Sequence, residues 1–187
     1  MNKIAVGPEA AGSIDIKKSP LWNYVQTTAI WKCPADTSTG RMNGYNSGAV
    51  TPRVRSMSMN NWVGGPGWAN SGTGWLVYHK TSQINKPGPS MTWVLLDERQ
   101  DSINDGYFVV DMKGYADQPN ACKIVDFPAS YHNFAGRLSF ADNHAEIRKW
   151  KDPRTVPMLR PGSELQLDVS SANNRDMIWL QERSTRK

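Results

Sequence analysis

The stretch GRLSFADNHAEIRKW, residues 136–150, decides the fold class of this chain. Apolar and polar side chains alternate through 136–141 and again through 144–150, which is the period of a half-buried strand. Asp142 and Asn143 lie between the two runs, and both residue types tolerate the positive φ that a two-residue hairpin turn requires. The stretch therefore predicts an antiparallel β-hairpin.

Outward from this hairpin, the sequence predicts further short strands and few helices. MTWVLLD, residues 91–97, is the most apolar run and predicts a central strand buried on both faces. A short helix is predicted after Ser19-Pro20, and a closing helix over 175–184, with Ile178, Trp179 and Arg183 facing different surfaces. Other short strands are predicted over 29–33, 54–62, 75–78, 107–110 and 124–127. We expect an α+β fold: a mostly antiparallel β-sheet with a short N-terminal helix and a C-terminal helix.

The length and hydropathy predict one globular domain. The chain has 187 residues, of which 39% are hydrophobic, enough for a core. Residues 1–18 are mostly small or polar and predict a flexible lead-in, so the domain is expected to cover 19–187. No apolar stretch is long enough for a signal peptide or a spanning helix, and we expect a soluble chain without a membrane span.

Charge and cysteine usage exclude some functions and leave one question open. The net charge of +5 comes from scattered basic residues, and no module that binds DNA or RNA is present, so we expect no nucleic-acid partner. Cys33 and Cys122 are far apart in sequence, and neither belongs to a CxxC motif. They could form a disulfide or remain two half-buried thiols.

Several segments, in this order, resemble a group of bacterial pseudopilin-like proteins of Planctomycetes and Verrucomicrobia, related to general secretion pathway G-type proteins of type II secretion. The similar segments are Trp31–Asp36 (WKCPAD), Val54–Asn60 (VRSMSMN), Pro87–Ser90 (PGPS), Leu96–Glu98 (LDE) with Ser102–Gly106 (SINDG), Pro128–Asn133 (PASYHN), Ser139–Asp142 (SFAD) and Trp179–Arg183 (WLQER).

The spacing of His132 and Asp142, with nine residues between them, is similar to the His-x9-Asp-Gly signature of this group, although Asn143 stands in place of the glycine. Group members begin with a prepilin leader and a long apolar helix, so the chain resembles their C-terminal head alone. The resemblance implies a structural or interaction component of a secretion or pilus-like apparatus. It also implies protein partners and a periplasmic, cell-envelope or extracellular location.

Acidic residues and histidines form a candidate metal site. Carboxylates at Asp97, Asp101 and Asp105 would suit Ca²⁺, and the resemblance implies a calcium loop of the kind that G-type pseudopilins use. His132, Asp142 and His144 would instead favour Zn²⁺ or another transition metal. Alternatively, His132 and Asp142 could hydrogen-bond each other or the backbone and simply fix the hairpin.

An alternative function is a small hydrolase, in particular a glycoside hydrolase, with or without a metal. Such enzymes use paired carboxylates, for which Asp97, Glu98 and Asp142 are the candidates, with His132 as a possible acid or base. Trp62, Trp68 and Trp75 border or lie within the glycine-rich loop 64–74. They could form a platform for a carbohydrate or a protein, or they could pack in the core.

Overall fold

The computed structural model describes residues 16–41, 50–159 and 164–187. They form two compact units. One unit contains the described residues as far as Met57 together with Asn104–Gly106, and the other contains Ser58–Ile103 and Tyr107–Lys187. Of the predicted lead-in, residues 1–15 lie outside the described part of the chain.

The N-terminal unit contains little regular structure. Helix α2 (Trp22–Val25) is followed by a 3₁₀ turn over Ala29–Trp31 and by an antiparallel pair of strands, β1 (Thr39–Arg41) and β2 (Val50–Pro52). The predicted N-terminal helix is therefore present, although its N-cap is Leu21 and no side chain caps it.

The strand predicted over 29–33 is wrong. The backbone N–H of Ala29 donates to the Oγ1 of Thr27 at 3.2 Å, and the N–H of Trp31 donates to the carbonyl of Thr28 at 3.1 Å. Local side-chain bonds of this kind favour a turn over an extended strand, so the β-propensity of Ile30 and Trp31 is overridden.

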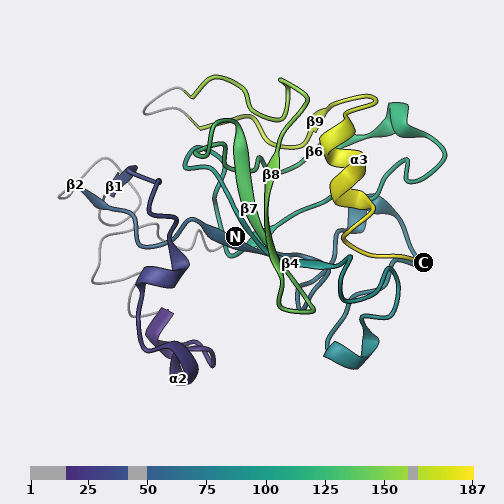
Figure 1. Ribbon diagram of the computed structural model, residues 1–187. Helices are drawn as coiled ribbons and strands as arrows, with labels where there is room; N and C mark the ends of the chain where they lie inside the picture. Colours follow the sequence, from purple (N-terminus) through teal and green to yellow (C-terminus); the bar gives the residue numbers. More distant parts are fainter. Residues whose placement is uncertain (1–15, 42–49, 160–163) are drawn as a thin grey trace. The chain divides into compact units, whose positions relative to one another are not determined.

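A five-stranded sheet is the framework of the larger unit (Figure 1). Its strand order is β5-β3-β4-β7-β8, with antiparallel pairing of β4 with β7 and of β7 with β8, and parallel pairing of β3 with β5. This confirms the predicted α+β class with a mostly antiparallel sheet. The strands are β3 (Met57–Asn60), β4 (Trp93–Asp97), β5 (Tyr107–Phe108), β7 (Ala135–Phe140) and β8 (Ala145–Lys149).

The hairpin that decides the fold forms as predicted. Strands β7 and β8 pair from Ser139 opposite Ala145 to Ala135 opposite Lys149, and Asn143 adopts the positive φ of 74° that the turn requires. Strand β4 pairs with the other edge of β7, with Leu96 opposite Leu138. Within the central strand, Val94 and Leu95 are half-buried, and Val94 packs against a second buried cluster of Val63, Tyr78 and Ile84.

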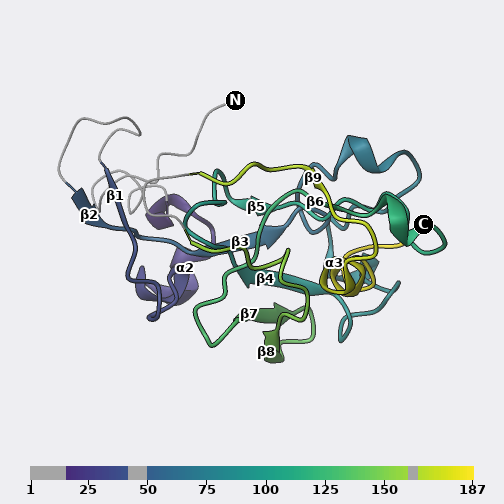
Figure 2. The same ribbon diagram turned by 90° about the horizontal axis from the view of Figure 1, so that it is seen from above.

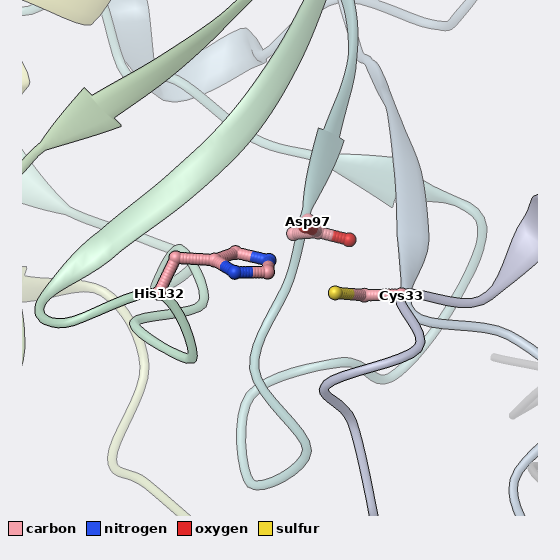
Figure 3. Close-up of side chains that lie close together, drawn as sticks. All are labelled: Cys33, Asp97 and His132. Atoms are coloured by element: carbon pink, nitrogen blue, oxygen red, sulfur yellow. The ribbon is translucent and has the colours of Figure 1, made fainter.

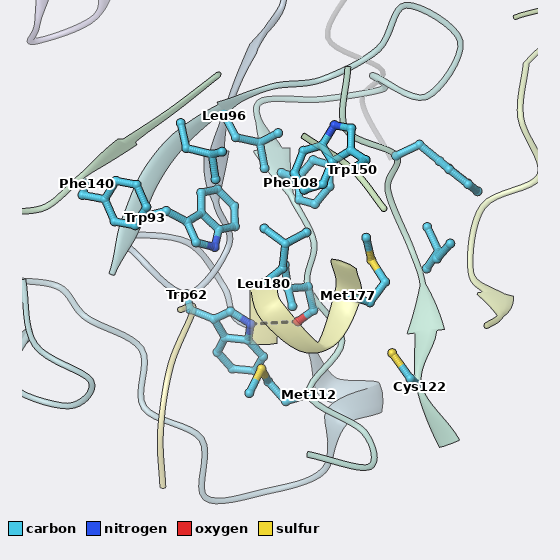
Figure 4. Packing of buried hydrophobic residues seen from close by; sticks show 14 residues of the cluster. Trp62, Trp93, Leu96, Phe108, Met112, Cys122, Phe140, Trp150, Met177 and Leu180 are labelled. Atoms are coloured by element: carbon cyan, nitrogen blue, oxygen red, sulfur yellow. Dashed lines mark hydrogen bonds between the residues drawn. The ribbon is translucent and has the colours of Figure 1, made fainter. Parts of the chain in front are cut away.

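The main cluster of buried hydrophobic residues includes side chains of β4, β5 and β7 (Figure 4). Trp93, Leu96 and Phe108 are fully buried there, and Leu180 of the C-terminal helix packs among them. Full burial of such a side chain contributes about 2–3 kcal/mol to the free energy of unfolding. Trp62 belongs to the same cluster, and its Nε1 donates to the carbonyl of Val110 at 2.9 Å.

Helix α3 (Arg175–Gln181) is the predicted closing helix. The side chain of Asn174 caps its N-terminus by accepting from the N–H groups of Asp176 and Met177. The indole of Trp179 lies between two guanidinium groups, those of Arg148 and Arg183, each 4.3 Å from its ring. Trp179 and Arg183 therefore share a face, contrary to the prediction, because residues four apart on a helix lie one above the other.

The remaining predicted strands are shorter than expected. Residues 75–78 form no strand, and Tyr78 makes only an isolated bridge with Val63. The strand expected over 124–127 is reduced to β6 (Lys123–Ile124), which pairs with β9 (Val169–Ser170) in a separate small ladder. Within the described ranges, no helix is long and apolar enough to cross a membrane.

Candidate functional site

Asp97 ends the central strand and is completely buried. The strand continues as an isolated bridge between Glu98 and Pro128, and the carbonyl of Asp97 accepts from the N–H of Ala129 at 2.7 Å. These two contacts fix the loop that follows Ala129 beside the end of β4. A carboxylic acid is thereby held at the carboxyl end of a central strand, away from bulk water.

His132 lies in that loop and is half-buried. The loop turns through positive φ at Asn133 and Phe134, and the N–H of Phe134 donates to the carbonyl of Ser130 at 3.2 Å. As a result, the imidazole of His132 faces the carboxylate of Asp97, and their metal-ligating atoms lie within 4.8 Å of each other (Figure 3).

The pair of Asp97 and His132 has two chemical uses. A carboxylate beside an imidazole can position it for proton transfer, and the same two groups could supply two ligands to a metal ion. Zinc takes at least three protein ligands in its usual sites, so this pair alone is an incomplete set. Cys33 belongs to the N-terminal unit.

Cys33 is buried, and its N–H donates to the Oγ of Ser56 in the same unit at 2.8 Å. Cys122 is buried in the larger unit, where burial first and the charge of Asp111 second raise the pKa of its thiol to about 11. The structure contains no disulfide between these residues.

Glu98 is buried and bound to its own loop. Its Oε1 accepts from the hydroxyl of Ser102 at 3.0 Å, and that hydroxyl accepts from the N–H of Phe127 at 2.8 Å. Because successive side chains of an extended chain point to opposite faces, Glu98 and Asp97 do not converge on one point. The two adjacent acids therefore cannot flank a single glycosidic bond as a catalytic pair.

Asp101 belongs to a buried ion pair. Both of its oxygens accept from Arg99, at 2.5 Å from Nε and at 2.9 Å from Nη2, and the third guanidinium nitrogen, Nη1, donates to the carbonyl of Pro157. Asp105 belongs to the other unit, where its carbonyl accepts from Arg55 at 2.5 Å. The oxygens of Asp101 are thus engaged by a cation, and the calcium loop implied by the resemblance does not fit this arrangement.

Asp142 and His144 form a separate, exposed pair at the turn between β7 and β8. Oδ1 of Asp142 lies 2.5 Å from Nδ1 of His144, whose ring stacks on Phe140 at 4.2 Å. The hydrogen bond from the His144 side chain lowers the pKa of Asp142. All of these contacts join residues of the turn, so the pair stabilises the turn itself.

The hydrogen bond expected between His132 and Asp142 is wrong. His132 precedes β7 and Asp142 follows it, so the full length of a six-residue strand, roughly 20 Å, separates them. The six candidate metal ligands therefore do not form one cluster. Within the larger unit, Asp97 is brought to His132 at one end of β7 and Asp142 to His144 at the other.

The three candidate platform tryptophans do not share one surface. Trp62 is 2% exposed and lies in the core, while Trp68 is half-buried and packs against that core. Trp75 meets Tyr115 edge to face at 6.2 Å, and the ammonium of Lys187 lies 4.8 Å from the Trp75 ring. Part of the Trp75 indole is thereby covered by the C-terminal residues.

One aromatic arrangement was not predicted from the sequence: Trp179 between Arg148 and Arg183. The four-residue spacing of Trp179 and Arg183 could have indicated the contact between these two side chains. Arg148 comes from β8, and no local pattern links that strand to the helix.

Comparisons with known proteins add no relative. No family model, curated protein or solved structure matches the chain.

Proposed function

We propose that this chain is a structural or interaction domain that resembles a pseudopilin head and acts with protein partners in a secretion or pilus-like apparatus of the cell envelope. One observation carries the proposal. Five of the segments on which the resemblance rests (WKCPAD, VRSMSMN, SINDG, LDE and PASYHN) are joined by hydrogen bonds to another of the five, which supports a structural role for their residues.

In the N-terminal unit, the WKCPAD and VRSMSMN segments are joined at Ser56. Its hydroxyl accepts from the N–H of Cys33 at 2.8 Å, and its own N–H donates to the carbonyl of Trp31 at 2.9 Å. The second segment is also joined to SINDG, because Arg55 donates to the carbonyl of Asp105. Buried polar groups satisfied in this way contribute to a unique fold.

In the larger unit, the same kind of link joins LDE to PASYHN through the carbonyl of Asp97 and the N–H of Ala129. Two acids nearby have structural partners as well: Ser102 for Glu98, and Arg99 for Asp101. Polar residues that hydrogen-bond within the fold are expected in a domain whose function is to keep a fixed shape for its protein partners.

The test is a calorimetric titration of the chain with each pseudopilin-like head encoded in the same genome. The proposal predicts saturable binding to at least one of them, with a dissociation constant of about 1–100 μM, as is usual for transient interfaces. The Asp97→Asn variant should bind equally well. Absence of binding to every head, each shown to be folded by circular dichroism, would contradict the proposal.

A second candidate is a small hydrolase, favoured by the adjacency of Asp97 and His132. The imidazole would act as acid or base with Asp97 orienting it, or both would help to hold a metal ion. A glycoside hydrolase that pairs Asp97 with Glu98 or Asp142 is less well supported, because the three acids point to different places.

The hydrolase candidate is tested with a panel of glycosides and esters, in EDTA and with added Zn²⁺ or Ca²⁺. Turnover lost in both Asp97→Asn and His132→Gln, but kept in the matched turn variant His144→Gln, would support it. A Zn²⁺-induced rise in melting temperature that Asp97→Asn and His132→Gln each remove, and that His144→Gln keeps, would identify a metal site.

A further inference from the structure

Strand β8 forms one edge of the five-stranded sheet, and in the described part of the chain only β7 pairs with it. Seen from above, β8 lies at the rim of the sheet beside β7 (Figure 2). Ala145, Ile147 and Lys149 are exposed, and the side chain of Ile147 is 63% exposed. An edge with an exposed Ile at its centre is a template for a further strand.

The hydrogen bonds at the two ends of the hairpin show which residues of β8 point their backbone N–H and carbonyl groups away from β7. The N–H of Phe140 donates to the carbonyl of His144, and the N–H of Trp150 donates to the carbonyl of Phe134. In an antiparallel ladder, residues that bond to the neighbouring strand alternate with residues that do not. His144 and Trp150 both bond to the chain at β7, so the even-numbered residues of β8 also bond to β7. The N–H and carbonyl groups of Ala145, Ile147 and Lys149 therefore point outward.

We propose that β8 pairs with β8 of a second copy of this chain, antiparallel and centred on Ile147. Ile147 then lies opposite Ile147 of the second copy, and Ala145 lies opposite its Lys149. Each of these pairs can exchange two N–H···O bonds because all of the groups involved point outward. The two sheets become one continuous sheet with twofold symmetry, the usual symmetry of homodimers.

The charges on β8 are complementary in this register. Glu146 lies opposite Arg148 of the second copy, and by symmetry Arg148 lies opposite its Glu146. These are pairs without backbone bonds between them, in which side chains approach most closely. A shift that centres the pairing on Lys149 would place two ammonium groups opposite each other. Charge therefore favours the register centred on Ile147 over the one centred on Lys149.

Arg148 is held in place for this contact. Its guanidinium stacks on Trp179 at 4.3 Å, so less side-chain freedom is lost when it meets a carboxylate. The contact involves a five-residue strand from each copy and is small, so the dimer is expected to be weak, with a dissociation constant between about 10 μM and 1 mM. The inference depends on β8 alone and not on the proposed function.

Sedimentation velocity of the full chain from about 10 μM to 1 mM tests the pairing. The chain should shift from monomer to dimer as its concentration rises. Glu146→Lys and Arg148→Glu should each weaken the dimer by about tenfold, because each creates two like-charged pairs. A mixture of the two variants should restore dimerisation, since both cross-strand pairs are then of opposite charge.

Two further variants control for folding and for net charge. Glu164→Lys changes the charge equally at an exposed position outside β8 and should leave the dimer unchanged. Ile147→Pro removes an outward N–H without removing a bond to β7 and should abolish the dimer in a chain whose circular dichroism is unchanged. A chain that stays monomeric up to about 1 mM, or a dimer that Glu146→Lys leaves intact, overturns the proposal.

Discussion

The indole nitrogen of Trp93 donates a hydrogen bond of 3.0 Å to the hydroxyl of Ser184, 91 residues later in the chain. Both side chains are completely buried. A second hydrogen bond joins the same two segments through the backbone: the N–H of Trp93 donates to the carbonyl of Arg183 at 3.2 Å. The end of the C-terminal helix is thereby fixed to the central strand, and this contact closes the core.

Removing the hydroxyl of Ser184 should destabilise the larger unit. Ser184→Ala leaves the Trp93 N–H buried without its acceptor, which typically costs about 1–3 kcal/mol of unfolding free energy. Urea unfolding followed by tryptophan fluorescence measures the change. Ser170→Ala, at an exposed position of β9, is the matched control and should change the free energy by less than about 0.5 kcal/mol.

The buried ion pair should be sensitive to the loss of one partner. Asp101→Ala leaves the guanidinium of Arg99 buried without its carboxylate, and such changes cost about 3–5 kcal/mol. The more exposed pair of Asp152 and Arg154 is the comparison, and Asp152→Ala should cost less than about 1 kcal/mol. Equal costs in chemical denaturation would contradict the structural role assigned to Asp101.

The turn pair should be visible in a titration. Because the side chain of His144 hydrogen-bonds Asp142, the pKa of this carboxyl lies below its ordinary value of 3.8. In His144→Gln the pKa of Asp142 should rise toward 3.8, because the hydrogen bond from the imidazole is lost. Carbon-detected NMR of the side-chain carboxyl over the acid range measures both. An unchanged pKa would show that the pair does not form in solution.

The thiol of Cys122 should be unreactive and should make stability depend on alkaline pH. Its folded pKa of about 11 lies above its ordinary value of 9.0, so the folded state favours the neutral thiol. The resulting stabilisation is fully present below pH 9 and is lost as pH rises toward 11. Unfolding free energies should fall more steeply across this window in the wild type than in Cys122→Ala.

A reactivity assay checks the same thiol independently. In the Cys33→Ser background Cys122 is the only cysteine. Ellman's reagent at pH 8 should react with it slowly in the folded chain and rapidly in urea, because the thiolate is the nucleophile. Fast reaction of the folded chain would contradict its burial.

The sequence predicts the elements that local pattern determines. The hairpin over 136–150 carries its period and its turn residues within fifteen residues, and the closing helix carries a cap at Asn174. The strand predicted over 29–33 fails because Thr27 offers a local hydrogen bond that competes with extension. The division near Met57 depends on contacts between distant segments, which periodicity does not encode.

The candidate site is only partly predictable for the same reason. Asp97 and His132 were both candidates, but their pairing depends on the loop fixed by Ala129 and on the register of β4 with β7. The spacing of His132 and Asp142 indicates two residues that bracket a strand, and bracketing residues lie at its opposite ends. Spacing alone does not distinguish this arrangement from a hydrogen-bonded pair.

The central claim is that this chain serves a secretion or pilus-like assembly as a scaffold rather than as a catalyst. Its most direct test is deletion of the gene in the cell that encodes it, with secreted protein and surface fibres quantified. The account predicts that both fall, and that wild type and the Asp97→Asn, His132→Gln double variant restore them equally. Unchanged secretion and fibres in the deletion strain, or restoration by wild type alone although the double variant is folded, would contradict it.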